Sequence, residues 1–227
     1  MRLIKAPEHT LLILVTGAVV LGLELIASRY MTPMFGSSLY VWGAILSMTL
    51  ACLSIGYSWG GRLAEKLPNP LQRFILLVLL SATWIAMIPF THRPIAHLAI
   101  EAGPTFGPIL ISTLLFALPI VALATATPIV FGENNRLRSG KSAATLIGDL
   151  FAISTFGSVF GALVTAYLII PNIGLRSAFF CLSGTLFAVC TPYIWRGLHL
   201  RLATLLLVSV ALLQLAYPNN PSADLKS

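Results

Sequence analysis

The 227-residue sequence is 57% hydrophobic and only 9% charged, and its mean hydropathy is +0.91. Soluble domains carry roughly 25% charged residues, so this composition excludes an ordinary globular core. The formal net charge is +7, but the basic residues are not gathered on one face with interleaved aromatic residues, which argues against a nucleic-acid partner. We therefore expect an all-α, polytopic integral membrane protein whose main surroundings are the lipid bilayer.

Seven apolar runs are long enough to cross a membrane, because a helix needs about 20 apolar residues to span the hydrocarbon core. The first run is too long for a signal peptide and lacks a small-residue cleavage site, so we read it as a retained helix. The runs leave no segment for a soluble catalytic domain, and we expect a single transmembrane domain without enzyme activity. The predicted helices cover residues 10–31, 39–61, 71–91, 106–131, 145–170, 175–195 and 200–217.

The lysine and arginine residues predict the orientation of this bundle. Ten of them fall before the first run or in the connections after the second, fourth and sixth runs, and four fall on the other side. Cytoplasmic loops carry the excess of Lys and Arg, so we expect a cytoplasmic N-terminus and an external C-terminus. The ten are Arg2, Lys5, Arg62, Lys66, Arg73, Arg136, Arg138, Lys141, Arg196 and Arg201.

Neither a metal site nor a cofactor is indicated. The three cysteines all lie inside predicted helices and form no C-x-x-C pair, as expected of small core residues. His92, His97 and Glu101 fall in or beside the longest predicted external loop, 93–107, where the two histidines are five residues apart rather than the four of a helical metal pair. We expect the start of this loop, PIAHLAIEA, to be solvated and to lie along the membrane surface.

Glu24 is the most unusual residue of the first predicted helix. A carboxylate at that depth costs about 2.5–3.5 kcal/mol on insertion scales. It must therefore face the bundle interior, carry a proton or have a partner. Arg29 is about 140° further round the helix, which makes direct pairing awkward. Two alternatives remain open, a polar tie between helices and a ligand or proton site.

Asp149 is the second acidic candidate, near the cytoplasmic start of the fifth predicted helix. There it is expected either to interact with the helix dipole or to belong to a polar site. Because Glu24 lies toward the external side, the two carboxylates are not expected to form a pair.

Two G-x-x-x-G patterns and a proline-rich helix indicate how the bundle packs. The patterns allow close helix approach, within one chain or between the copies of a homo-oligomer. The fourth predicted helix contains Pro119 and Pro128, which remove backbone donors and can break the helix beside a substrate site. The glycines of the two patterns are Gly56, Gly60, Gly157 and Gly161.

Two long segments resemble a known family. GLELIASRYMTPMFGSSLYVWGAILSMTLACLSIGYSWGGRLAEK, residues 22–66, and LFAISTFGSVFGALVTAYLIIPNIGLR, residues 150–176, are similar to the membrane module of bacterial membrane-bound spermidine-synthase-like proteins. Residues 123–131 match the family's proline-containing fourth helix more loosely. In that family the module precedes a soluble aminopropyltransferase-like domain, but this sequence has no G-x-G-x-x-G motif, so only the membrane module carries over.

The resemblance implies a multi-pass protein of the bacterial inner membrane. Its first expected role is a membrane subunit or anchor for a separate aminopropyltransferase-like or methyltransferase-like enzyme. The alternative is a protein that binds or transports a cationic small molecule, with Glu24 in the site, and a purely structural protein is a third. The candidate residues for a ligand-binding or polar interior site are Glu24, Ser28, Arg29, Ser37, Tyr40, Tyr57, Asp149 and Thr155.

Overall fold

The computed structural model describes residues 7–136 and 143–196, and these residues form helices without a β-strand. The expected all-α class is therefore confirmed for the described part of the chain. The elements in chain order are α1 (Pro7–Phe35), α2 (Leu39–Lys66), α3 (Pro70–Glu101), α4 (Gly103–Ile111), the π-helical segment η1 (Ser112–Ala117), α5 (Leu118–Ala124), α6 (Ala126–Arg136), α7 (Ala143–Val164), the π-helical segment η2 (Thr165–Ile169) and α8 (Ile170–Arg196).

Five helical stretches of the described residues are long and apolar enough to cross a membrane. The expected seven are not all found as separate spans. The fifth stretch, Ala143–Ile194, contains two of the expected helices, and the expected span 200–217 lies outside the described residues. The stretches are Glu8–Phe35, Leu39–Lys66, Pro70–Glu101, Gly103–Asn135 and Ala143–Ile194.

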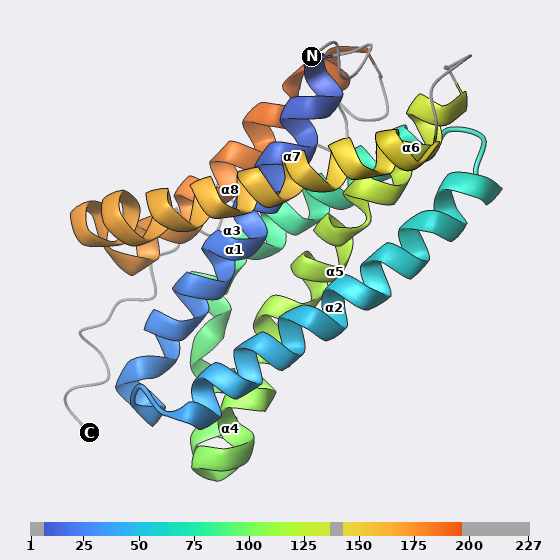
Figure 1. The fold of residues 1–227 in the computed structure, drawn as a ribbon. Coiled ribbons are helices and arrows are strands. Elements are labelled where there is room, and N and C mark those ends of the chain that lie inside the picture. Colours follow the sequence, from blue (N-terminus) through green and yellow to red (C-terminus); the bar gives the residue numbers. More distant parts are fainter. Residues whose placement is uncertain (1–6, 137–142, 197–227) are drawn as a thin grey trace.

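The fifth stretch reverses direction at Gly174, whose φ of 75° and ψ of 171° are not helical. Figure 1 shows α7 crossing the bundle from the upper right to the left, and α8 running from there back toward the top. This conformation is essentially confined to glycine, because a Cβ would clash with the neighbouring peptide. The sequence PNIG therefore separates two helices, as the expected boundaries at 170 and 175 implied.

Helix α1 occupies the middle of the bundle (Figure 1). It packs most extensively against α7 and α8, while α2 packs on α5 and α6, and α3 packs on α8. One large cluster of buried apolar side chains joins α1, α2, α3, α5, α6 and α8, with Leu23, Ile45, Phe74 and Phe116 among its fully buried members, while Leu146 and Leu150 of α7 belong to a smaller cluster with Ile13 and Val130. Because α1 contributes to most of these contacts, a polar group on α1 is held among several helices.

The expected long loop at 93–107 is wrong, because nearly all of these residues are helical. Helix α3 continues to Glu101 through Pro89 and Pro94, and α4 begins at Gly103 after a turn at Ala102. The extension contacts α4 along one face, since Ala99 is fully buried and Gly107 of α4 lies against its carbonyl oxygen, while Leu98 and Ile100 are exposed. Apolar contact with α4 thus outweighs the helix-breaking tendency of the two prolines.

We expect Gly174→Ala to destabilise the protein by about 1–3 kcal/mol, because alanine cannot adopt this backbone conformation without strain. Gly184→Ala is the matched control, since Gly184 lies inside α8 with open space around its Cβ position. SDS-induced unfolding in mixed micelles, followed by circular dichroism, measures both. Equal stability of the two variants would contradict a strained turn at Gly174.

Candidate functional site

Glu24 lies deep in the bundle, and one of its carboxyl oxygens has no hydrogen-bond partner in the described part of the chain. Its side chain is only 8% exposed, and its Oε1 atom has no hydrogen-bond partner among the described residues. At about 1.5 Å per residue, Glu24 is roughly 17 Å from the Phe35 end of α1. For an α1 centred in a hydrocarbon core of about 30 Å, the carboxyl is roughly 10 Å below the membrane boundary. A polar tie between helices and a ligand or proton site both stay open as predictions, and the described residues supply no hydrogen bond to Oε1.

A cavity of about 320 Å³ begins one helical turn away from Glu24. Val20, four residues earlier and on the same face of α1, lines it, and side chains on a helix lean toward the helix N-terminus. Glu24 itself is not among the residues that line this cavity. Six of its lining residues carry hydroxyl groups, and they come from α1, α2, α6 and α7. They are Thr16, Tyr57, Thr127, Ser154, Thr155 and Ser158. We name this space the hydroxyl cavity.

Glycines bring α7 against α1 at one side of the hydroxyl cavity. The Cβ position of Gly17 meets the Ser154 carbonyl oxygen, and the Ser158 hydroxyl donates to the Gly17 carbonyl at 3.1 Å. Gly157 and Gly161 lie directly against the α1 backbone at Leu14 and Ala18. The glycines of this pattern thus serve packing within the chain and place the α7 hydroxyls beside α1.

The second glycine pattern packs α2 against the fourth membrane stretch. Gly56 lies against Ala124, and Gly60 lies against Thr125 and Pro128. These contacts leave the neighbouring Tyr57 on the wall of the hydroxyl cavity, where its ring meets Phe151 of α7 edge to face at 5.8 Å between centroids.

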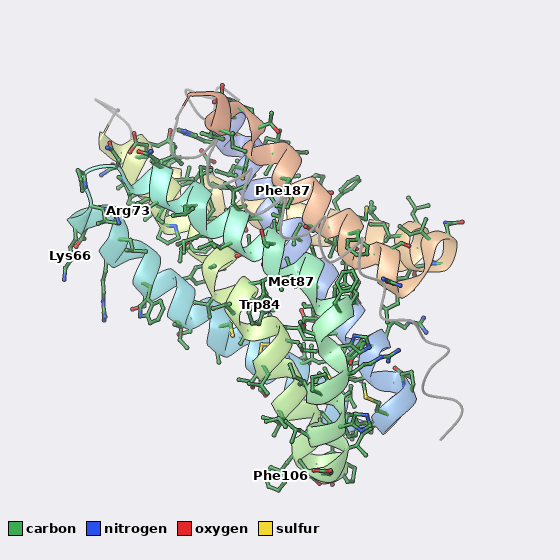
Figure 2. All side chains as sticks on the ribbon, turned by 180° about the vertical axis from the view of Figure 1, so that it is seen from behind. Lys66, Arg73, Trp84, Met87, Phe106 and Phe187 are labelled. Atoms are coloured by element: carbon green, nitrogen blue, oxygen red, sulfur yellow. The ribbon has the colours of Figure 1, made fainter. Side chains whose placement is uncertain are left out.

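The fourth membrane stretch is interrupted at two places, each close to an expected proline break. The π-helical segment η1 ends at Ala117, two residues before Pro119. Pro119 has no N–H for the Leu115 carbonyl, and that carbonyl instead accepts a hydrogen bond from the Trp84 indole of α3 at 2.9 Å (Trp84 is labelled in Figure 2). A donor from a neighbouring helix therefore replaces the missing one.

The second interruption is a turn at Thr125, between α5 and α6. Pro128 sits in the first turn of α6, where a missing N–H is tolerated. The Thr125 hydroxyl donates to the Ala122 carbonyl at 2.7 Å and supports the turn. Ala124 and Ala126, on either side of Thr125, both line the hydroxyl cavity, so the helix break forms part of its wall.

The remaining sequence candidates are divided between different places. Tyr57 and Thr155 line the hydroxyl cavity, whereas Ser28, Arg29 and Ser37 line a different cavity nearer the Phe35 end of α1. Tyr40 lies in the first turn of α2 and is 60% exposed. The predicted set is therefore not one site.

Asp149 lies outside both cavities and is half-buried in α7. The structure describes α7 from Ala143, which puts Asp149 in the second turn, beyond the turn where a helix dipole acts most strongly. Because Gly17 contacts Ser154, Glu24 lies about 10 Å to one side of this contact and Asp149 about 8 Å to the other. The two carboxylates are thus well apart, as the sequence indicated.

Four hydroxyl residues of the cavity were missed by the sequence reasoning: Thr16, Thr127, Ser154 and Ser158. Ser154 and Ser158 are four residues apart and share one face of α7, so their spacing could have identified them. Thr16 and Thr127 have no such signal, because isolated threonines are common in membrane helices. Among the described residues, no group of three or more His, Cys, Asp and Glu could hold a metal ion.

No family model, no curated protein and no solved structure matches this chain. The resemblance to spermidine-synthase-like proteins accordingly stays a prediction.

We expect Gly157→Ala to cost about 1–3 kcal/mol of stability, since the added methyl group would overlap the Leu14 carbonyl and force α1 and α7 apart. Gly148→Ala is the matched control in the same helix, because nothing lies near its Cβ position. The control should be neutral or more stable by up to about 1 kcal/mol from helix propensity. Unfolding in a graded SDS series distinguishes them, and a neutral Gly157→Ala would contradict the close α1–α7 contact.

Proposed function

We propose that this chain is a multi-pass membrane protein whose Glu24 and hydroxyl cavity bind a small cationic molecule. The observation that carries the proposal is the buried Oε1 atom of Glu24, which has no hydrogen-bond partner in the described part of the chain. A buried charged group without a partner is costly, and the carboxyl can relieve this cost by binding a proton or a cation. Intramembrane acidic groups that face a bundle interior commonly mark such sites.

The chemistry of the cavity favours an amine as the cation. An ammonium group can donate to the Glu24 carboxylate and to the surrounding hydroxyl oxygens. The rings of Tyr57 and Phe151 supply aromatic surface against which a cation can pack. A volume of about 320 Å³ is at the small end of ligand pockets, which favours a short amine. The resemblance to polyamine-linked proteins points in the same direction, by analogy.

The break at Thr125 supports a carrier rather than a static binding protein. Interrupted helices beside a central cavity are common in transporters, where they can rearrange without breaking long hydrogen-bond ladders. Here the interruption lies in the cavity wall, between Ala124 and Ala126. A rearrangement of α6 relative to α5 would therefore reshape the hydroxyl cavity.

The membrane-subunit hypothesis remains the competing prediction. A chain that only anchors a soluble enzyme needs no unpaired carboxyl in its interior. The exposed Arg62, Lys66 and Arg73, at the α2–α3 end of the molecule, offer a basic surface on which such an enzyme could dock (Lys66 and Arg73 are labelled in Figure 2).

We expect Glu24→Gln to abolish amine binding while the protein keeps its fold. Thermal-shift measurements with putrescine and spermidine on the detergent-solubilised protein should show stabilisation of the wild type and none of the variant. Since the carboxyl has no bonded partner at Oε1, Glu24→Gln should leave the free energy of unfolding unchanged or raise it.

Glu101→Gln is the matched control, because Glu101 is exposed at the end of α3 and its removal changes the net charge equally. It should retain the shift. A loss of about 3–5 kcal/mol of stability in Glu24→Gln would instead indicate a tie between helices. No shift with either amine would overturn the binding proposal and favour the membrane-subunit hypothesis.

We further propose the finer topology given by the sequence, namely seven spans in a bacterial inner membrane with a cytoplasmic N-terminus. Single cysteines introduced by Leu3→Cys, Thr105→Cys and Ser222→Cys, after replacement of the native cysteines, test it with a membrane-impermeant maleimide on intact cells. We expect labelling at 105 and 222, and labelling at 3 only after permeabilisation. Equal behaviour of positions 3 and 222 would require an even number of spans and would contradict seven.

A further inference from the structure

A second cavity lies near the Phe35 end of α1 and differs in character from the hydroxyl cavity. Its volume is about 320 Å³, and it lies between the last turns of α1, the start of α2 and the junction of η2 with α8. Arg29, Ser37, Trp42 and Ala166 are among the residues that line it. We name it the Arg29 cavity.

The charge of the Arg29 cavity is positive. Arg29 is the only charged residue on its lining, and no ion pair of Arg29 is found within the part of the chain that the structure describes. Glu24 lies five residues earlier on α1, about 140° round the helix and about 7.5 Å along it, so the carboxylate faces away from the guanidinium. A guanidinium without an acidic neighbour is available to an anion.

Further donors border the same space. The Ser37 hydroxyl and the Trp42 indole both line the cavity, and both can donate to an oxyanion. The hydroxyl hydrogens of Ser28 and Thr32 are instead donated to carbonyl oxygens of α1, at 3.2 Å and 2.8 Å. The 28-residue helix α2 begins at Leu39 beside the cavity, so the positive end of its dipole adds to the field of Arg29.

For an α1 centred in the membrane, the cavity would lie at the membrane interface. Arg29 is about 9 Å from the Phe35 end of α1, which is within a few ångströms of the hydrocarbon boundary for a centred helix. Trp42 lies beside it, and tryptophan is enriched at this level of a bilayer. Lipid phosphates occupy the same level, and a dissolved phosphate can reach it from water.

We propose that the Arg29 cavity binds a phosphate group, carried either by a phospholipid headgroup or by a soluble phosphate compound. The guanidinium fork matches two phosphate oxygens, while Ser37 and Trp42 can donate to the others. Widening of the helix in the π-helical segment η2, which includes Ala166, helps to form the space, as π-helical turns often do at binding sites. This site is separate from Glu24, and its existence does not depend on the proposed amine binding.

Isothermal titration of the whole detergent-solubilised protein tests the site with three probes: dihexanoyl phosphatidic acid, dihexanoyl phosphatidylcholine and inorganic phosphate. We expect phosphatidic acid to bind and phosphatidylcholine to bind more weakly, because its choline group neutralises the phosphate. Arg29→Gln should weaken binding at least about tenfold, since a charge-assisted bidentate contact is lost, and Arg29→Lys should lose less.

Arg62→Gln is the matched control, because Arg62 is also exposed but lies near the opposite end of α2. It should change the affinity less than about twofold, since exposed charges further apart than a Debye length of about 10 Å are largely screened. Ala166→Leu keeps every charge but fills the cavity, and it should weaken binding as Arg29→Gln does. Melting curves of Arg29→Gln and Ala166→Leu show whether each variant keeps its fold. Weaker binding by a folded variant then reports loss of the site.

The probes also identify the source of the phosphate. Binding of phosphatidic acid without inorganic phosphate would assign the site to lipid headgroups, and binding of both or of inorganic phosphate alone would assign it to a phosphate group in general. The proposal would be overturned if neither phosphatidic acid nor inorganic phosphate bound. It would also be overturned if Arg29→Gln and Arg62→Gln lost the same amount of affinity.

Discussion

The close contact between α1 and α7 is the interaction on which the rest of the interior depends. Two helices can approach to backbone contact only where one of them lacks side chains, and Gly157 and Gly161 meet this requirement against Leu14 and Ala18. In a bilayer, packing of this kind replaces much of the hydrophobic driving force that stabilises soluble bundles. The contact fixes the register of α7, so that the Ser158 hydroxyl reaches the Gly17 carbonyl and the hydroxyl cavity forms beside it.

The buried carboxyl of Glu24 is energetically unfavourable in this arrangement. The bundle supplies a buried position to the carboxyl but no bonded partner for Oε1 in the described residues, although helix interiors usually satisfy such groups. A chain selected only for stability would replace Glu24 with an apolar residue. Its position one helical turn from Val20, which lines the hydroxyl cavity, is the physical reason for proposing a ligand there.

Residues of α1 line both cavities, but the lining residues of the two cavities differ in charge. Along α1, Val20 lines the hydroxyl cavity and Ser28 lines the Arg29 cavity, while Glu24 lies one turn from each. The acidic group is deep in the bundle, and the basic group is near its edge. Under the two proposals, this order would place the cation in the low-dielectric interior, where a partner for the carboxylate is worth most, and the anion near the headgroups.

The sequence by itself determined the helical class, the presence of helices long and apolar enough to span a membrane, the glycine pairs, the turn before residue 175 and the interior position of Glu24. These features depend on local composition: long apolar runs, missing side chains and the high cost of exposing a carboxylate to lipid. The tertiary structure decided which helices contact one another, which the local sequence pattern does not encode. It showed that α3 continues past Pro94 because Ala99 packs against α4, that Trp84 supplies the donor for the Leu115 carbonyl left free by Pro119, and that the candidate polar residues divide between two cavities. Each depends on which helices meet, and contacts between residues far apart in sequence leave no periodic trace along the chain.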